Sequence, residues 1–381
     1  VGLSLALALS GCSSSSDGGG GSEVSTFDAS EMLANTADNT VAGIYENMAT
    51  KAQEMEDAVT AFTDEPNAEN LETAQEEWVD TRIFWERSES FLFGPVDADG
   101  IDPRIDEWPL DESQLDQVLA ANQNGIDQPL IDSLANNLRG FHVVEFLLFS
   151  DSNDSNDIDD PAEGQDSLNN VVSAIANNAD RAEYLRQAAT DVRQQADTLR
   201  DAWAPDDDEN FGSRLETAGD DGNTTFASQR AGVQQVIDGM IVIADEVGAG
   251  KISDPFSQED PLIVESKHSF NSRTDFKNNI RGIKHIYLGD FPFQEDGGED
   301  GPGVTDFVQA VGTSATDQAV RTQIDLAIEE IDQIDQPFRD SITGNETQRA
   351  QIQNAIDAVL EIRRLLEEEV TPLLDDAEFA Q

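Results

Sequence analysis

One short stretch of the chain combines an imidazole and a carboxylate at a spacing that places them side by side. His142 and Glu145 lie in the run 139–149, which is otherwise mostly apolar, and His142 is one of only three histidines in the chain. Positions three residues apart share one face of a helix. Burying an ionisable group is costly unless the group is paired or bound to a metal. The pair therefore indicates either a metal site or a buried ion pair.

A second set of charged residues lies on an apolar stripe within residues 67–93. Along this stripe Arg82 and Glu89 recur at steps of three and four with Trp78 and Trp85, which is the pattern of a core-facing helix surface. Charged side chains are rarely fully buried without a partner. We therefore expect Arg82 and Glu89 to lie inside the protein beside the two tryptophans.

Imidazole and carboxylate groups are good ligands for zinc, iron or copper. We expect His142 and Glu145 to hold a metal ion, with Glu89 as the third ligand and Asp106 as the fourth. The alternative is structural: His142 and Glu145 would form a buried pair that links helices, and Arg82 would form a second salt bridge with Glu89.

The chain carries a large negative net charge. Its 381 residues include 78 acidic and 22 basic side chains, which give a formal net charge of −56. Non-specific nucleic-acid binding needs a basic surface, so we expect no nucleic-acid partner. Acidic residues spread over the whole length, with a self-repelling surface, are typical of a halophilic protein adapted to high salt.

The start of the chain resembles a secretory signal. Residues 1–11 form a short apolar signal-peptide segment, and Leu9-Ser10-Gly11-Cys12 is similar to the lipobox of bacterial lipoproteins. Cys12 is the only cysteine, so no intrachain disulfide can form. We expect a lipid on Cys12, a flexible Ser/Gly-rich tether over 12–29, and an extracytoplasmic, membrane-anchored lipoprotein in the periplasm or at the cell surface.

The rest of the sequence predicts helices, because apolar residues recur at steps of three and four without sustained strand alternation. The expected helices cover residues 32–62, 67–93, 130–149, 168–203, 226–247, 275–288, 319–338 and 352–374. We expect a first helical bundle over 30–204, an acidic linker over 205–225 and a second helical bundle over 226–381.

The two halves share a short sequence. Asn-Asn-Leu-Arg-Gly at 136–140 is echoed by Asn-Asn-Ile-Arg-Gly at 278–282, in the corresponding place of each half. This predicts an all-α fold of two related four-helix-type bundles that arose by internal duplication and carry long acidic loops. Lys284 and Tyr287 replace the histidine and the glutamate in the second copy, so the chemistry is confined to the first.

Several motifs together resemble the imelysin family. They are Trp78-x3-Arg82-x2-Trp85-x3-Glu89, Phe93-Gly94-Pro95, Ile105-Asp106-Glu107-Trp108-Pro109 and Gly140-x-His142-x2-Glu145. The resemblance covers roughly residues 30–375, judged by order and spacing. It implies two helical bundles with a site near their interface, in a secreted or lipid-anchored protein linked to iron uptake.

The resemblance also suggests which residues line the ligand cleft. They are Arg82, Trp85 and Trp108 from the first half and Ser269 and Asn271 from the second, although helix capping is an alternative role for the last two. The ligand would be iron or another divalent metal, or a metal-bearing small molecule, and a possible partner is an uptake transporter.

Two other functions remain open. A metallopeptidase would use His142 and Glu145 as zinc ligands, but the chain lacks a His-Glu-x-x-His motif, and only His268 or His285 could add a second histidine. We therefore favour binding over catalysis. The other alternative is a purely structural surface protein without a ligand.

Overall fold

The structure, a computed structural model, describes residues 26–121, 125–150, 165–205, 207, 209–290 and 301–380. The predicted signal segment 1–11, the lipidation site Cys12 and nearly all of the tether lie outside the described residues. The acidic segments 151–164 and 291–300 lie outside them too.

The first half begins with a short strand and continues as helices. In chain order its elements are β1 (Thr26–Phe27), α1 (Ser30–Asn35), η1 (Thr36–Val41), α2 (Ala42–Asp64), α3 (Ala68–Ser88), η2 (Glu89–Phe91), α4 (Pro95–Ala98), α5 (Ile101–Asp106), α6 (Glu112–Ala121), α7 (Gln128–Ser133), η3 (Asn136–Leu138), α8 (Phe141–Phe149), α9 (Gln165–Ala176), α10 (Ala179–Ala202) and α11 (Phe211–Glu216). Here η1 is π-helical, whereas η2 and η3 are 3-10 turns.

The second half is helical and ends in a second short strand. Its elements are α12 (Gln229–Asp245), η4 (Glu246–Ile252), α13 (Ser253–Gln258), η5 (Pro261–Ile263), α14 (Ser272–Leu288), α15 (Val304–Val311), α16 (Ser314–Asp332), α17 (Phe338–Ser341), α18 (Glu346–Leu365), η6 (Leu366–Val370), α19 (Leu373–Asp376) and β2 (Glu378–Phe379). Here η4 and η6 are π-helical and η5 is a 3-10 turn.

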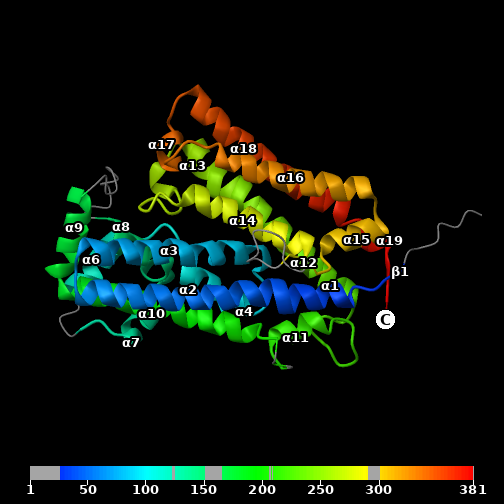
Figure 1. Ribbon diagram of the computed structural model, residues 1–381, viewed down its shortest axis with the longest axis horizontal. Coiled ribbons are helices and arrows are strands. Elements are labelled where there is room, and N and C mark those ends of the chain that lie inside the picture. Colours follow the sequence, from blue (N-terminus) through cyan, green and yellow to red (C-terminus); the bar gives the residue numbers. More distant parts are fainter. Residues whose placement is uncertain are drawn as a thin grey trace, which may run out of the picture.

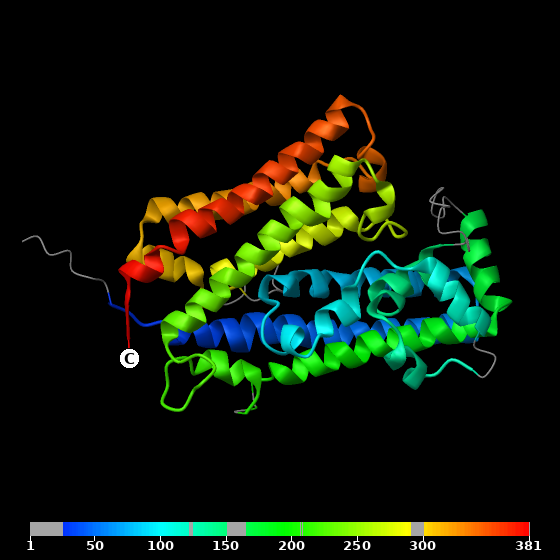
Figure 2. The same ribbon diagram turned by 180° about the vertical axis from the view of Figure 1, so that it is seen from behind.

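The long helices form two layers (Figures 1 and 2). Helix α2 packs against α3 and α10, and α8 packs against α3 and α10. In the other layer α16 packs against α14 and α18, and α12 packs against α14 and α18. Helix α3 meets α14 where the layers join. The predicted all-helical fold is confirmed; an origin by duplication stays a prediction.

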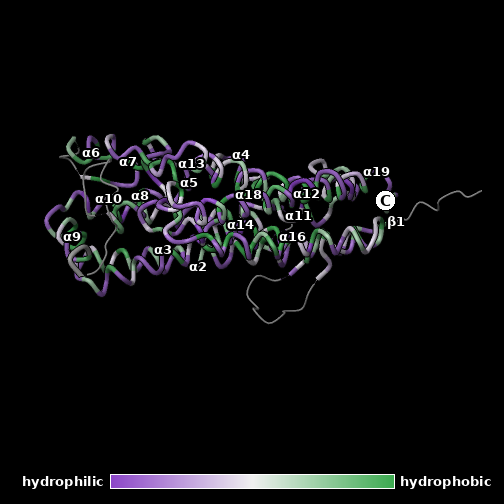
Figure 3. The backbone as a smooth tube through the Cα atoms, turned by 90° about the horizontal axis from the view of Figure 1, so that it is seen from above, coloured by the Kyte–Doolittle hydropathy of each residue, from purple (hydrophilic) through white to green (hydrophobic). Residues whose placement is uncertain are grey.

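The helices are held by their apolar faces. Figure 3 shows hydrophobic and hydrophilic residues alternating along each helix at close intervals, as expected for helices that are half exposed. In α2 the buried positions Ile44, Met48, Met55 and Phe62 follow one another at steps of four and seven. One connected hydrophobic core includes side chains from both layers. None of the described helices is long and apolar enough to cross a membrane.

Several predicted helices are interrupted: the expected helix 319–338 ends at Asp332 of α16, and Phe338 begins α17. Two further interruptions have a clear local cause. The expected helix 130–149 is in fact α7, η3 and α8, because Leu134 and Ala135 are extended and Gly140 adopts φ +80° and ψ −164°, outside the helical region. The expected helix 168–203 is divided into α9 and α10 at Asn178, whose side chain accepts the Arg181 amide proton and caps α10. Both predictions of one continuous helix were wrong because the apolar periodicity continues through the breaks.

The predicted acidic linker 205–225 is more ordered than expected. It contains α11, and the Phe211 ring packs edge-on against Trp203 with ring centroids 5.2 Å apart. The Asn223 side chain donates to the Arg214 carbonyl and receives the Phe226 amide proton, which ties the loop to itself. This segment is therefore part of the packed body of the protein.

The two strands bring distant parts of the chain together. Thr26 and Phe27 of β1 pair in parallel with Glu378 and Phe379 of β2. The rings of Phe27 and Phe379 both pack against Phe307 of α15, with centroids 5.4 and 5.9 Å away. The first and last described segments are thus fixed at one end of the molecule (Figure 1).

Candidate functional site

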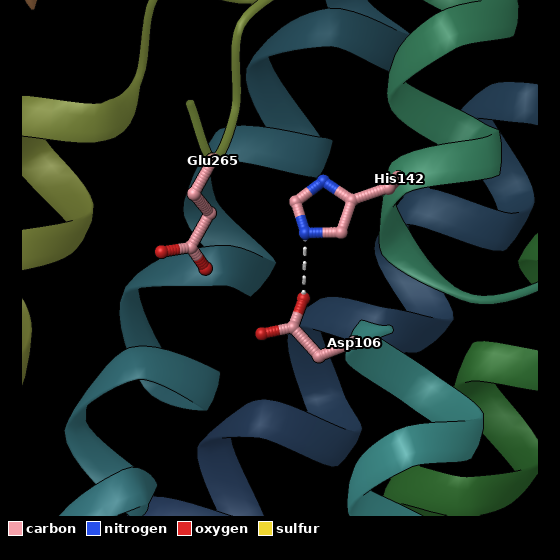
Figure 4. Close-up of side chains that lie close together, drawn as sticks. All are labelled: Asp106, His142 and Glu265. Atoms are coloured by element: carbon pink, nitrogen blue, oxygen red, sulfur yellow. Dashed lines mark ion pairs between the residues drawn. The ribbon is translucent and has the colours of Figure 1, made fainter. Parts of the chain in front are cut away.

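Three buried side chains from three separate segments converge where the layers meet. Asp106 ends α5, His142 lies in the first turn of α8, and Glu265 follows η5. Each offers one ligand atom, and these atoms all lie within 4.8 Å of one another. Figure 4 shows the three side chains facing a common centre. No other group of this kind occurs among the described residues.

Gly140 explains how α8 approaches α5. Its backbone has φ +80°, a region in which side chains are strained, and a Cβ at this position would overlap the Ile105 carbonyl oxygen. Because glycine lacks that atom, the start of α8 lies directly on the end of α5. The contact sets His142 against Asp106, the neighbour of Ile105.

His142 is held between two carboxylates. Its Nδ1–H donates to Glu145 Oε2 at 3.1 Å, and its Nε2 lies 3.2 Å from Asp106 Oδ1. Burial alone would lower the pKa of His142, but the hydrogen bonds to Asp106 and Glu145 raise it to about 10. The imidazole is therefore cationic at neutral pH, and a metal at Nε2 would replace its proton.

Glu145 is fixed from its far side by the second half of the chain. Its Oε1 accepts the amide protons of His268 and Ser269, at 2.9 and 2.8 Å, and the Ser269 hydroxyl proton at 2.9 Å. Burial alone would raise the pKa of Glu145, but the hydrogen bond and charge of His142 lower it to about 2. Because Glu145 holds Nδ1 while Asp106 faces Nε2, these two carboxylates lie on different sides of the ring.

Asp106 is also fixed on one side. Its Oδ2 accepts the indole proton of buried Trp85 at 2.5 Å, and its Oδ1 pairs with Arg82. Burial alone would raise the pKa of Asp106, but the charges of Arg82 and His142 hold it well below its usual range. Its Oδ1 is therefore an anionic donor directed at His142.

Glu265 has a carboxylate oxygen without a partner. Its Oε1 accepts from Arg82 Nη2 at 2.8 Å and from Lys251 Nζ at 3.3 Å. Its Oε2 is buried and makes no hydrogen bond to any described residue. A buried acceptor without a donor is costly. The Glu265 carboxylate, which belongs to the group of three donors, therefore has an oxygen that is suited to a metal ligand.

The cluster contains more negative than positive groups. Arg82 also pairs with Glu86 and, at 3.7 Å, with Asp275, whereas Lys251 pairs with Glu89 at 2.7 Å and Glu86 at 3.4 Å. Six buried carboxylates thus face two permanent cations and one imidazole: Glu86, Glu89, Asp106, Glu145, Glu265 and Asp275 against Arg82, Lys251 and His142.

The excess of carboxylates affects their protonation. Burial raises the pKa of Glu89, Glu265 and Asp275, and the nearby cations Lys251 and Arg82 do not cancel this effect. Buried charges are stable only when they are neutralised. The cluster must therefore take up protons or a further cation.

Trp108 covers the cluster on its outer side. Its ring centroid is 6.3 Å from that of His142, and Lys251 Nζ lies 5.4 Å from the centroid of the same ring. Trp108 is partly exposed, whereas His142 and Lys251 are buried. It separates the buried charges from solvent.

The predicted site residues lie at different depths around this centre. Glu89 contacts Lys251 and Asn279, not His142, and it is Glu265 that lies in one group with Asp106 and His142. Asn271 makes no side-chain cap on α14; its amide donates to Asp275 Oδ1 at 2.7 Å.

Sequence reasoning missed several members of the cluster. Glu86 follows Arg82 by four residues, a spacing typical of a helical ion pair, and could have been found. Asn279 lies in the repeated Asn-Asn-Ile-Arg-Gly segment, but the repeat did not predict a contact for its side chain. Lys251 and Glu265 lie in a π-helical segment and a turn, where no periodicity distinguishes buried from exposed positions.

The sequence and the fold both have known relatives. The sequence model of a family described as Imelysin matches residues 42–366. Iron-regulated protein A from Synechococcus elongatus is 30% identical over 253 residues, which cover 66% of this chain and 62% of that protein. The chain thus spans less than two thirds of the length of that relative.

Two crystal structures have the same fold. One is described as an iron-regulated protein A precursor from Parabacteroides distasonis ATCC 8503; it has a TM-score of 0.76 and 25% identity, with 93% of this chain and 97% of that chain covered. The other is an imelysin-like protein from Psychrobacter arcticum 273-4, with a TM-score of 0.66 and 14% identity, and the match covers 90% of this chain and 94% of that one.

Proposed function

This chain belongs to the imelysin family, whose sequence model matches most of its length, and from that premise we propose that it binds one metal ion between Asp106, His142 and Glu265. One observation carries the proposal. Three buried donor atoms lie within 4.8 Å of one another, and one of the three residues, Glu265, has an oxygen without any partner in the described structure.

The donors suit a transition metal of intermediate hardness. One imidazole and two carboxylates are typical ligands of iron, zinc and manganese, whereas a site for copper(I) would use thiolate or thioether sulfur. Iron is the cargo we favour, because the relative from Synechococcus is an iron-regulated protein. In this proposal Glu145 orients His142 and Glu89 holds Lys251, and neither contacts the ion.

The charge of the cluster also favours a cation. Six carboxylates exceed the three groups that can be cationic, all of them buried. A divalent ion would replace the protons that the excess carboxylates otherwise need, so binding would release protons. Arg82 is part of this balance because it bonds both Asp106 and Glu265.

We further propose that the protein works outside the cytoplasm in iron uptake. The lipobox-like segment before Cys12 supports attachment through a lipid on that cysteine, and the acidic surface is suited to a saline environment. A binding protein with a single enclosed site would deliver its ion, or a small metal-bearing ligand, to an uptake transporter. These steps rest on the sequence and on the names of the relatives.

A peptidase is the weaker alternative. A hydrolytic metal needs an open coordination position that a substrate can reach, but Asp106, His142 and Glu265 are at most 4% exposed. Neither of the other histidines joins the three donors: the side chain of His268 contacts Glu112 at 3.2 Å, and the ring nitrogens of His285 on α14 make no hydrogen bond to any described residue. Enclosure favours storage or transfer of an ion.

The test is metal binding by matched carboxylate variants. The native protein, Glu265→Gln and Asp317→Asn would be stripped with chelator in high salt and titrated with Fe²⁺ and Zn²⁺, with bound metal counted by mass spectrometry. Asp317 is an equally buried carboxylate bonded to Tyr287 and Thr305 in the second layer.

We expect one ion per native chain and per Asp317→Asn chain. Glu265→Gln should lose more than about 100-fold in affinity, since loss of a second-shell group alone costs 10–100-fold. A native protein that binds neither ion, or a Glu265→Gln variant that binds as tightly as the native protein, would refute the proposal. Metal-dependent peptide cleavage by the native protein would favour the peptidase.

A further inference from the structure

We infer that the segment Val264–Asn271, here called the latch, couples occupation of the metal site to the docking of the two halves, and that Ser269 is a positioning residue for His142. The inference rests on the proposed metal site and adds its regulation. The latch connects η5 to α14. It supplies Glu265 to the three donors, whereas Asp106 and His142 come from the first half.

The latch contacts the first half at three places. Glu265 bonds Arg82 of α3. The backbone and hydroxyl of Ser269 bond Glu145 of α8. The side chains of Lys267 and His268 both reach Glu112 Oε1 of α6, at 3.0 and 3.2 Å. These residues are buried or nearly so, so the contacts are made away from bulk water and each depends on the two halves being closed.

The contacts at Ser269 decide where the imidazole points. Three donors from the latch occupy Glu145 Oε1, which leaves Oε2 for His142 Nδ1. With Nδ1 bonded to Glu145, Nε2 is the ring nitrogen that faces Asp106. An outer partner that fixes the tautomer and orientation of a ligating histidine is a recurrent feature of metal sites. Here the outer partner is itself held from the other half.

The backbone of the latch is held in an unusual shape. Ser266 and Phe270 have φ of +51° and +60°, a left-handed conformation that non-glycine residues rarely adopt and that persists only where the surroundings impose it. Arg339 of α17 supports this conformation: its guanidinium stacks 4.3 Å from the Phe270 ring centroid and donates to the Lys267 carbonyl. The latch thus needs contacts on both sides to keep its shape.

One segment therefore delivers a metal ligand and also orients another ligand. Closing the latch places the Glu265 carboxylate beside His142 and Asp106, and it sets the orientation of the His142 ring through Ser269 and Glu145. An ion bonded to donors from both halves would oppose opening, because opening would remove one ligand and release the orientation of a second. Metal binding and latch closure are then linked equilibria, and each must favour the other.

The experiment compares serine variants by metal affinity and by hydrogen exchange. Ser269→Ala removes the hydroxyl, Ser269→Thr keeps it, and Ser341→Ala removes a buried hydroxyl whose partner, the Asp335 carbonyl, belongs neither to the latch nor to the three donors. Each full-length protein would be titrated with Zn²⁺, and amide exchange in residues 264–271 would be measured with and without the ion.

We expect Ser269→Ala to bind Zn²⁺ about 10-fold more weakly, within the range for outer partners of metal ligands, and Ser269→Thr to recover most of the loss. Zn²⁺ should slow exchange in the latch of the native protein and of Ser341→Ala, and slow it less in Ser269→Ala. A purely structural serine would lower stability without changing this metal-induced protection.

The outcomes separate this inference from the proposed function. If the native protein binds Zn²⁺ but exchange in the latch is unchanged, or if Ser269→Ala binds as tightly as Ser341→Ala, the coupling is refuted and the metal site stands. If the native protein binds no ion, both proposals fail. Tighter binding by Ser269→Ala would also overturn the positioning role.

Discussion

Replacement of Gly140 by alanine should damage both stability and the metal site. The residue has φ +80° and ψ −164°, a combination that is essentially restricted to glycine and costs other residues about 1–3 kcal/mol. A Cβ would also meet the Ile105 carbonyl oxygen and carbon and the Arg104 carbonyl oxygen. These are backbone atoms, so the clash cannot be relieved by rotating a side chain.

The cost of the strained backbone and the cost of the steric clash should add. Forcing an extra carbon into a packed contact costs about 1–3 kcal/mol, so Gly140→Ala should lower the free energy of unfolding by about 2–6 kcal/mol in total. Any relief must move α5 away from α8, and Asp106 follows Ile105 directly. We therefore expect weaker metal binding in addition to lower stability, because the distance from Asp106 to His142 would increase.

The matched control is Gly100→Ala. Gly100 also has positive φ, +65°, but no atom lies within 4 Å of a Cβ built there, so only the left-handed backbone is penalised, at about 1–2 kcal/mol. Denaturant unfolding in constant high salt would compare the two variants, and Zn²⁺ titration would follow the site. Equal destabilisation by both variants, or an unchanged metal affinity in Gly140→Ala, would refute the reasoning.

Three other predictions concern the charges. Arg82→Met should lower the unfolding free energy by about 3–5 kcal/mol, because it leaves Asp106 and its neighbouring carboxylates without their buried cation; a denaturation midpoint equal to that of the native protein would contradict this. Burial and the charge of Arg87 lower the pKa of His285 from 6.5 to about 3. Between these two pH values the unfolded chain is protonated at this residue and the folded protein is not, so the free energy of unfolding falls as pH drops below 6.5. The stability of His285→Gln relative to the native protein should therefore be about 2 kcal/mol higher at pH 5 than at pH 8, as calorimetry at both pH values would show. An equal stability difference at the two pH values would exclude the pKa of His285 as the cause. Finally, the net charge of −56 predicts that unfolding free energy rises between 0.1 and 1 M KCl, as the Debye length falls from about 10 to about 3 Å, and a flat profile in denaturant titrations would argue against adaptation to salt.

Local sequence patterns were enough to predict the helices and part of the cluster. Arg82 and Trp85 were recognised because a helical stripe places them on the apolar face of α3, and the structure buries both. His142 and Glu145 were recognised in the same way, and they do contact each other. All of these features depend on residues within one or two turns of each other.

The third donor could not be predicted from local patterns. Glu265 is 183 residues from Arg82 in sequence, and nothing near it distinguishes this glutamate from other acidic residues of the chain. The partner of Glu89 was not predicted for a related reason: a helical stripe shows that a side chain is buried but not which residue it contacts. Lys251, its partner, comes from a π-helical turn in the other layer.

The long-range hydrogen bonds have a consequence for how the chain folds as it is synthesised. The Asn35 amide donates to the carbonyls of Gly289 and Pro302, and Arg82 depends on Glu265 and Asp275. A ribosome releases the first half long before these partners exist. The nascent first half must therefore remain incomplete until the second half emerges, because Asn35 lacks its acceptors and Glu89 lacks its cation Lys251. Slow or interrupted translation would leave that intermediate exposed to proteases and to aggregation.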